Sequence, residues 1–286
     1  MRLAIVALAL VPATAHATYS IVATDTATRQ VGGAGTSCIG SNSVRIIYGS
    51  VPGKGAVHAQ AQLGGPGKMA AVMQIGMDAA PTDIITSITQ TAFDANAQRR
   101  QYGIVDLAMR SAGFSGTQNG AFSGDRQGTL GAFTYSVQGN ILTSVAVIDH
   151  AETAFRGQGC DLADRLMLAL EAGAQNGEGD SRCTPNGIPS DSAFIQVDRD
   201  GEAAGTYLVL DVRGTAPASP LPMLRAQYDA WRVTNPCPVV AQPDGVGGGD
   251  DMGGCCSSTD GARSLFWVPA AWLVLRRRRR SFRAGA

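Results

Sequence analysis

The amino-acid sequence predicts an α+β layered sandwich for its central part, residues 18–235. Strand-like segments come first, helical segments follow, and strands return before a last helix, which is not the regular alternation of a doubly wound parallel sheet. Hydrophobic residues make up 44% of the 286-residue chain and charged residues only 16%, so the chain can bury a core of this kind. We therefore expect one large domain with an additional segment at each end.

The first half of this domain is predicted to open with a β-hairpin, because strand formers alternate at its start and a glycine-rich strand returns after a turn. Small residues at alternate positions imply that another layer packs closely on this sheet. Apolar side chains then recur with helical spacing from Pro66, most clearly in the segment that begins with Pro81. Strands are expected at 18–24, 30–36, 43–50 and 55–61, and the clearest helix at 81–95.

The second half is predicted to continue the strands, to pass through two helices, and to end with two strands and a helix. The strands are expected at 99–108, 110–115, 129–136, 140–142, 192–197 and 206–212. The helices are expected at 145–155, 161–174 and 220–231.

The N-terminal segment, residues 1–17, has the pattern of a secretory signal peptide. Arg2 is followed by an apolar stretch and then by Ala15, His16 and Ala17, which form an A-x-A cleavage site. A short buried helix is the alternative interpretation. Cleavage after Ala17 leaves Thr18 as the first residue of the mature protein.

Export would place the cysteines in an oxidising compartment, where disulfides form. Four of the six cysteines lie in or next to the central domain, and four cysteines allow three pairings. Cys160 and Cys183 flank one helical segment, so we favour this pair and, as the second bond, Cys38–Cys237. Buried free thiols are the alternative. The cysteine and histidine spacings match no metal motif, and no metal is expected.

The C-terminal part changes composition into a Pro/Gly-rich linker at 236–254 and a tail at 255–286. The tail contains Cys255 and Cys256, an apolar run at 265–275 and five arginines at 276–280. This order resembles the C-terminal sorting tails of surface proteins in myxobacteria and their relatives. The resemblance implies membrane contact through the tail before processing, and a protein at the cell surface or outer envelope, or released from it. A free basic tail on anionic surfaces is the alternative.

The folded part is acidic, because residues 18–275 hold 23 acidic and 16 basic residues while arginines near the ends bring the net charge of the chain to zero. Nucleic-acid binding needs a basic face, so no nucleic-acid partner is expected. The glycine clusters lack the strand and helix context of a P-loop or a dinucleotide fingerprint. We therefore expect no cofactor.

Several segments match, in order and spacing, a bacterial family. They read TYSIVA at 18–23, RRQYGIVD at 99–106, QGNIL at 138–142, LMLALEAG at 166–173 and GDSR at 179–182. Residues 18–233 thereby resemble the family of domain of unknown function 1028. The resemblance implies the N-terminal-nucleophile hydrolase fold, a four-layer αββα sandwich, without a settled substrate. The loop at 62–67 lacks the aromatic residue usual in the family and 183–189 looks like an insertion, so a substrate cannot be transferred.

Thr18 is the candidate nucleophile, because an N-terminal threonine carries its own base. The α-amine has a pKa near 8 and can take the proton of the hydroxyl, which then attacks an amide carbonyl. Water afterwards hydrolyses the acyl ester. The predicted cleavage site falls immediately before this threonine, which starts the family-like segment. The alternative is an ordinary first residue of a strand, where threonine is common.

Five further residues are candidates for the site. Asn140 is a candidate oxyanion donor, or otherwise a turn residue. Ser37 ends the second strand and could hydrogen-bond the amine, or is an ordinary hairpin serine. Asp180 and Arg182 could position the amine or a substrate carboxylate, or form a surface ion pair. Gln60 could line the site or bond a neighbouring loop.

The sequence thus predicts a secreted amidohydrolase-like enzyme that acts on a small amide or peptide substrate. His58 and His150 fit no serine triad motif. A non-catalytic surface or ligand-binding domain with the same fold is the competing hypothesis, and a structural surface component is a third. The sequence leaves open whether the protein forms a homo-oligomer.

Overall fold

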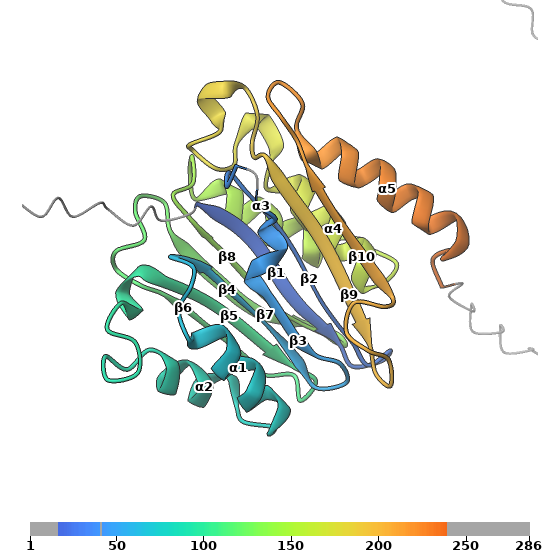
Figure 1. Ribbon diagram of the computed structural model, residues 1–286. Helices are drawn as coiled ribbons and strands as arrows, with labels where there is room; N and C mark the ends of the chain where they lie inside the picture. Colours follow the sequence, from blue (N-terminus) through green and yellow to red (C-terminus); the bar gives the residue numbers. More distant parts are fainter. Residues whose placement is uncertain (1–16, 41, 239–286) are drawn as a thin grey trace, which may run out of the picture. The chain divides into compact units, whose positions relative to one another are not determined.

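The computed structural model describes residues 17–40 and 42–238 and has a mixed α+β fold with two antiparallel sheets (Figure 1). The predicted signal peptide up to residue 16 and the tail at 255–286 lie outside the described residues, as does all of the linker beyond residue 238. The last helix ends at Thr234, next to the expected domain boundary. None of the helices in the described part of the chain is long and apolar enough to cross a membrane.

The larger sheet has six strands in the order β10-β9-β2-β1-β8-β7. Its strands are β1 (Thr18–Asp25), β2 (Gln30–Ser37), β7 (Gly124–Leu130), β8 (Phe133–Asn140), β9 (Ser192–Arg199) and β10 (Leu208–Arg213). The smaller sheet has the order β3-β4-β5-β6. Its strands are β3 (Tyr48–Val51), β4 (Gly55–Ala61), β5 (Arg100–Asp106) and β6 (Ser111–Ser115).

Helices flank the two sheets (Figure 1). They are α1 (Gly67–Gly76), α2 (Pro81–Ile88), α3 (Ala146–Arg156), α4 (Leu162–Ala172) and α5 (Pro220–Thr234). Side chains of α3, α4 and α5 share one apolar core with the six-stranded sheet, and those of α1 and α2 share another with the four-stranded sheet. A third core lies between the two sheets and includes Val22, Tyr48 and Val105.

Strand β1 shows how the sequence builds this arrangement, because successive side chains of a strand point to opposite faces. Tyr19 and Ile21 belong to the core shared with the helices, and the Tyr19 hydroxyl donates to the carbonyl of Leu170 in α4 at 2.7 Å. Ser20 points the other way and donates to Gln60 of the second sheet at 2.6 Å. The even-numbered residues of β1, which begin with Thr18, therefore face the second sheet.

The close approach of the sheets explains a glycine in β2. A Cβ atom added to Gly33 would lie 2.4 Å from His58 Nε2 and 2.9 Å from Tyr48 Cδ2, and both of these rings come from the second sheet. We expect Gly33→Ala to lower the free energy of unfolding by roughly 1–3 kcal/mol, since an overpacked core must shift its backbone or rotamers. Urea unfolding measures this.

Gly76→Ala is the matched control, because a Cβ added there meets no atom within 4 Å. Gly76 ends α1, where alanine is the better helix former, so this variant should be at least as stable as the wild type. A Gly33→Ala protein with undiminished stability would show that the sheets are not packed as closely as the structure has them.

Four expected elements differ from the structure, and three of them are only part of what was expected or are divided differently. The strand expected at 43–50 begins only at Tyr48, because Val44–Ile47 forms a 3-10 turn in which the Ser43 hydroxyl accepts the N–H of Arg45. The strand expected at 129–136 is instead the hairpin of β7 and β8, which turns at Gly131 with φ +56°. The helix expected at 81–95 ends at Ile88.

The short strand expected at 140–142 is also wrong. Asn140 ends β8, and the next residue, Ile141, has a φ of +52°, which turns the chain out of the sheet. Leu142 then forms an isolated bridge with Asp180. This bridge brings a distant loop to the end of β8.

The favoured disulfide pairing is wrong. The bonds are Cys38–Cys183 and Cys160–Cys237, with Cα separations of 5.7 and 5.6 Å. Helix α4 begins just after Cys160 and has 11 residues, a length of about 16 Å at 1.5 Å per residue. Cys183 follows the far end of this helix, whereas disulfide Cα atoms must lie within about 7 Å. The helix carries the chain away from Cys160, and the loop after it runs to the end of β2, where Cys183 bonds to Cys38.

Candidate active site

Thr18 lies at the start of β1, between the ends of two neighbouring strands. The antiparallel register places it directly opposite Ser37 of β2 and Asn140 of β8. All three side chains are buried. The hairpin and β8 thus bring together the three residues that the sequence suggested for catalysis.

The hydroxyls of this cluster bond to each other and to the peptide bond before Thr18. Thr18 Oγ1 donates to Ser37 Oγ at 3.1 Å, and Ser37 Oγ donates to the carbonyl oxygen of Ala17. Ala17 is the last residue of the predicted signal peptide. Ser37 therefore lies between the Thr18 hydroxyl and the bond that signal cleavage would cut.

Asp180 and Arg182 reach the same carbonyl from a loop. Arg182 Nη2 donates to Ala17 O at 3.0 Å and to Asp180 Oδ2 at 2.8 Å, and its Nε donates to Asp180 Oδ1 at 3.1 Å. Asp180 is fully buried, so this is not the surface ion pair weighed as the alternative. Burial raises the pKa of the Asp180 carboxyl, while Arg182 and the N–H groups of Arg182 and Cys38 oppose that shift.

The Cys38–Cys183 disulfide fixes this loop to the sheet. Cys38 follows Ser37 directly, and Cys183 follows Arg182. The Cys38 N–H also donates to Asp180 Oδ2 at 2.6 Å. The bond and this contact hold the charged pair beside Ala17 and Thr18.

Gln60 joins Thr18 to the second sheet. Its Nε2 donates to the carbonyl of Thr18 at 3.2 Å and to Gln101 Oε1 at 2.8 Å. Gln101 Nε2 in turn donates to Gly139 O at 2.8 Å, next to Asn140. Sequence reasoning placed Gln60 near the site but missed Gln101, although Gln101 lies in the family-like segment at 99–106.

His58 is buried in β4 of the second sheet, opposite Ser20 rather than Thr18 of β1. Its Nδ1 lies 2.8 Å from Ser20 Oγ, and Nε2 has no hydrogen-bond partner in the described part of the chain. Burial lowers the pKa of His58 to about 3, so the ring is neutral at pH 7. His150 lies elsewhere, with Nδ1 3.9 Å from Glu178.

A cavity of about 180 Å³ borders the site at Gln60. Its other lining residues include Gln62, Lys68, Arg100 and Tyr102. The buried Arg100 forms an ion pair with Asp94 at 2.8 Å and donates to the carbonyls of Gln62 and Leu63. Arg100 thereby holds the loop at 62–65 that forms one wall. Sequence reasoning noted this loop but missed Arg100 and Lys68.

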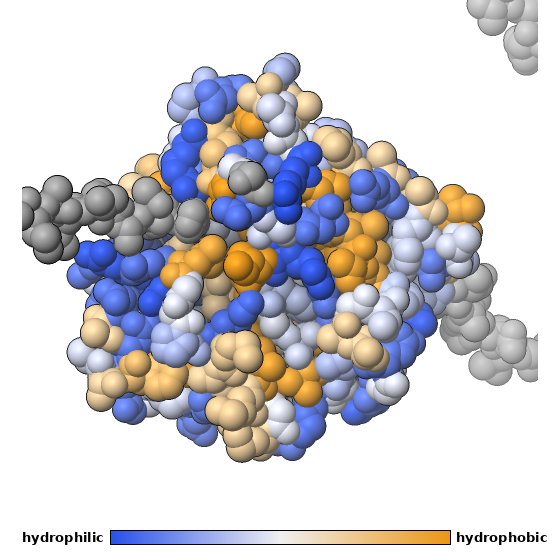
Figure 2. All heavy atoms as spheres, in the orientation of Figure 1, coloured by the Kyte–Doolittle hydropathy of each residue, from blue (hydrophilic) through white to orange (hydrophobic). Residues whose placement is uncertain are grey.

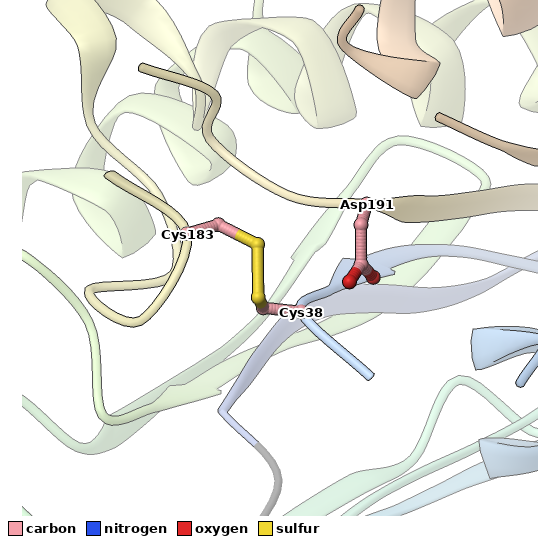
Figure 3. Close-up of side chains that lie close together, drawn as sticks. All are labelled: Cys38, Cys183 and Asp191. Carbon is pink, nitrogen blue, oxygen red and sulfur yellow. A yellow bond between two sulfur atoms is a disulfide. The ribbon is translucent and has the colours of Figure 1, made fainter. Parts of the chain in front are cut away.

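Cys38, Cys183 and Asp191 form the cluster of possible metal ligands found among the described residues (Figure 3). The two sulfur atoms are bonded to each other, so neither is a thiolate ligand. The Asp191 carboxylate accepts the N–H groups of Ile39 and Gly40 at 2.8 and 2.9 Å. These bonds give the cluster a structural role at the end of β2.

The fold and the site define a two-sheet α+β protein whose first strand starts with a buried threonine between two strand ends. Residues 18–224 match the family of unknown function DUF1028, and the chain belongs to that family. The match begins at Thr18.

A crystal structure of protein SPO2555 from Silicibacter pomeroyi, of the same family, is similar to this chain. The TM-score is 0.62 and the identity 22%, over 76% of this chain and 86% of that one. At this identity the likeness concerns the fold alone. No curated protein matches the chain.

Proposed function

We propose that the mature protein is an exported amidohydrolase-like enzyme whose nucleophile is the N-terminal residue Thr18. The observation that carries this proposal is the set of side chains around the Ala17–Thr18 peptide bond. The Thr18 hydroxyl, Ser37 and the Asp180–Arg182 pair all meet there. The start of the family match at Thr18 supports the same assignment. The two sheets with their flanking helices would then be the αββα sandwich of the N-terminal-nucleophile hydrolases.

Removal of Ala17 would free the side chains that contact its carbonyl for a role in catalysis. Ser37 and Arg182 lose the carbonyl to which they donate, and the α-amine of Thr18 becomes free beside them. Ala17 is fully buried, so its loss also leaves space next to the hydroxyl. That space is where the substrate amide would lie.

The reaction needs only groups of this cluster. The neutral α-amine takes the proton of the Thr18 hydroxyl, directly or through Ser37, while Oγ1 bonds to the amide carbon. We assign Asn140 as the donor to the developing oxyanion. The ammonium then gives its proton to the leaving nitrogen, and the C–N bond breaks. Water hydrolyses the resulting ester, which releases the acid and restores the hydroxyl.

Export is part of the proposal because the mature N-terminus depends on it. The two disulfides are compatible with an oxidising compartment. The tail at 255–286 would contact the membrane before processing and leave the domain at the cell surface or free in the medium.

One added residue tests the role of the amine. We expect a mature chain that starts at Ala17 to fold like the chain that starts at Thr18, since Ala17 has a place in the structure. Its amide hydrolysis should be at least about a thousandfold slower, because the base has become a peptide nitrogen. A panel of short amides and N-acyl amino acids, with intact mass to verify each N-terminus, measures the difference.

Equal turnover by the two chains would show that the α-amine of Thr18 is not the base of the reaction. The competing hypothesis, a non-catalytic ligand-binding domain, draws on the cavity beside Gln60 and on the altered loop at 62–67. It predicts that both chains bind the same ligands and that neither hydrolyses them.

A further inference from the structure

Lys68 is a half-buried cation that has no acidic partner among the described residues. It lines both the cavity beside Gln60 and an adjoining groove that also contains Arg45 and Gln196. Lys68 Nζ donates to the carbonyls of Ile46 and Tyr48, at 2.5 and 3.5 Å. Within residues 17–40 and 42–238, no carboxylate forms an ion pair with it. Burial and the charge of Arg45 both lower the pKa of Lys68.

The two arginines next to the site are paired with carboxylates. Arg100 pairs with Asp94, and Arg182 holds Asp180 with two nitrogens. The sequence suggested that Arg182 could bind a substrate carboxylate, but in the structure this arginine is bonded to the carboxylate of Asp180. Lys68 is the cation that an incoming anion would neutralise.

The nearby carboxylates do not serve Lys68 either. Asp211, which lines the groove, accepts the Ser43 hydroxyl at 2.5 Å. Asp198 is buried and accepts five hydrogen bonds, from Tyr48, Ser50, Gly205 and, twice, Gln196. Arg45 donates through Nε to Gln196 at 2.8 Å and is exposed. The groove therefore offers an anion one half-buried ammonium and one exposed guanidinium.

One residue, Gln60, links this cavity to the candidate nucleophile. Gln60 lines it and contacts the Thr18 carbonyl, while Leu63 and Met69 give it apolar walls. Over α1 and β3, Figure 2 shows hydrophobic and hydrophilic side chains side by side. The volume of this cavity, about 180 Å³, is below the roughly 300–1,000 Å³ of sites for drug-sized ligands, so the part of a ligand that lies inside it must be small.

We propose that Lys68 binds the carboxylate of a small acidic amide, whose amide group reaches Thr18 past Gln60. This inference rests on the proposed function for the position of the amide and specifies its substrate class. The substrate has a carboxylate at one end, a short apolar chain and the scissile amide at the other. Arg45 adds a long-range attraction from the adjoining groove.

Binding without turnover tests the subsite separately from the chemistry. Mature Thr18→Ala protein is titrated calorimetrically with the monoamides of oxalic, malonic, succinic and glutaric acid and with the matching neutral diamides. We expect at least one acid to bind tenfold or more tightly than its diamide, with a preference that falls as salt rises. Lys68→Met should abolish this preference, and Lys68→Arg should keep part of it.

Lys54→Met is the control, because Lys54 is paired with Asp78 and does not line this cavity. It should leave the preference intact, and thermal melting verifies that every variant is folded. The proposal is overturned if no acid binds more tightly than its diamide, or if folded Lys68→Met keeps the preference. Wild-type turnover of neutral amides, unaffected by Lys68→Met, would overturn the subsite but leave Thr18 as nucleophile. A preference for the acid that depends on Lys68, in a protein that hydrolyses no amide, would support the subsite but overturn Thr18 as nucleophile.

Discussion

Replacing Thr18 with alanine in the mature chain is expected to reduce amide hydrolysis at least about a thousandfold, because the variant has the amine but no hydroxyl to form the ester. Thr18→Ser should keep measurable turnover, since it leaves a hydroxyl beside the same amine. Both proteins should fold, as Thr18 Oγ1 makes one modest hydrogen bond to Ser37. Steady-state rates on the amide panel give the comparison.

Thr24→Ala is the matched control for this experiment. Thr24 lies on the same strand and the same face as Thr18, is equally buried, and donates to the Asp106 carbonyl at 3.1 Å. Its removal should cost about 1 kcal/mol of stability and no activity. Turnover that survives in Thr18→Ala, or that falls equally in Thr24→Ala, would remove Thr18 from the chemistry.

The second large effect concerns the Cys38–Cys183 disulfide, which joins residues 145 apart in sequence. Loop-closure entropy predicts that Cys38→Ser with Cys183→Ser lowers the free energy of unfolding by about 4–5 kcal/mol. Activity should fall as well, under conditions where the variant is folded, because the loop with Asp180 and Arg182 loses its attachment beside Thr18. Denaturant unfolding and turnover are measured on the same samples.

The other disulfide provides the contrast. Cys160–Cys237 closes a loop of 77 residues and lies away from the charged pair. Its double serine variant should lose stability of a similar order, about 4 kcal/mol, and keep its activity. If peptide mapping without reduction found Cys160 bonded to Cys183, or if both variants lost activity equally, the account of the loop would be wrong.

The sequence alone predicts the part of the site that depends on two strands close to each other in the chain. The hairpin predicted around 25–28 brings the end of the second strand near Thr18, and alternation fixes which side chains of β1 share a face. The turn at 26–29 in the structure sets Ser37 directly opposite Thr18. The association of Asn140 with Thr18 came from the family resemblance. The register of β1 with β8 brings these two residues together in the structure, while the role of each in catalysis stays a prediction.

The rest of the candidate site depends on how elements far apart in the sequence pack together, which no local sequence pattern predicts. The contact of Gln60 with Thr18 requires the second sheet to lie across the first. Arg182 reaches Ala17 because the loop crosses to β2, where Cys183 bonds to Cys38. The helix that Cys160 and Cys183 flank suggested a bond between these two, but the loop after the helix carries Cys183 to Cys38 instead. Lys68 carries no motif, and only its position in the cavity distinguishes it from a surface lysine.

The most direct measurement of the central claim is covalent trapping of the acyl intermediate. Mature protein is treated with an electrophilic acyl donor such as a β-lactone, and its intact mass and peptide fragments are determined. The account predicts one acyl group on Thr18, released by alkaline hydroxylamine as expected for an oxygen ester. It predicts no such adduct in Thr18→Ala or in the chain that retains Ala17. A stable adduct on any other residue, or equal labelling of Thr18→Ala, would contradict it.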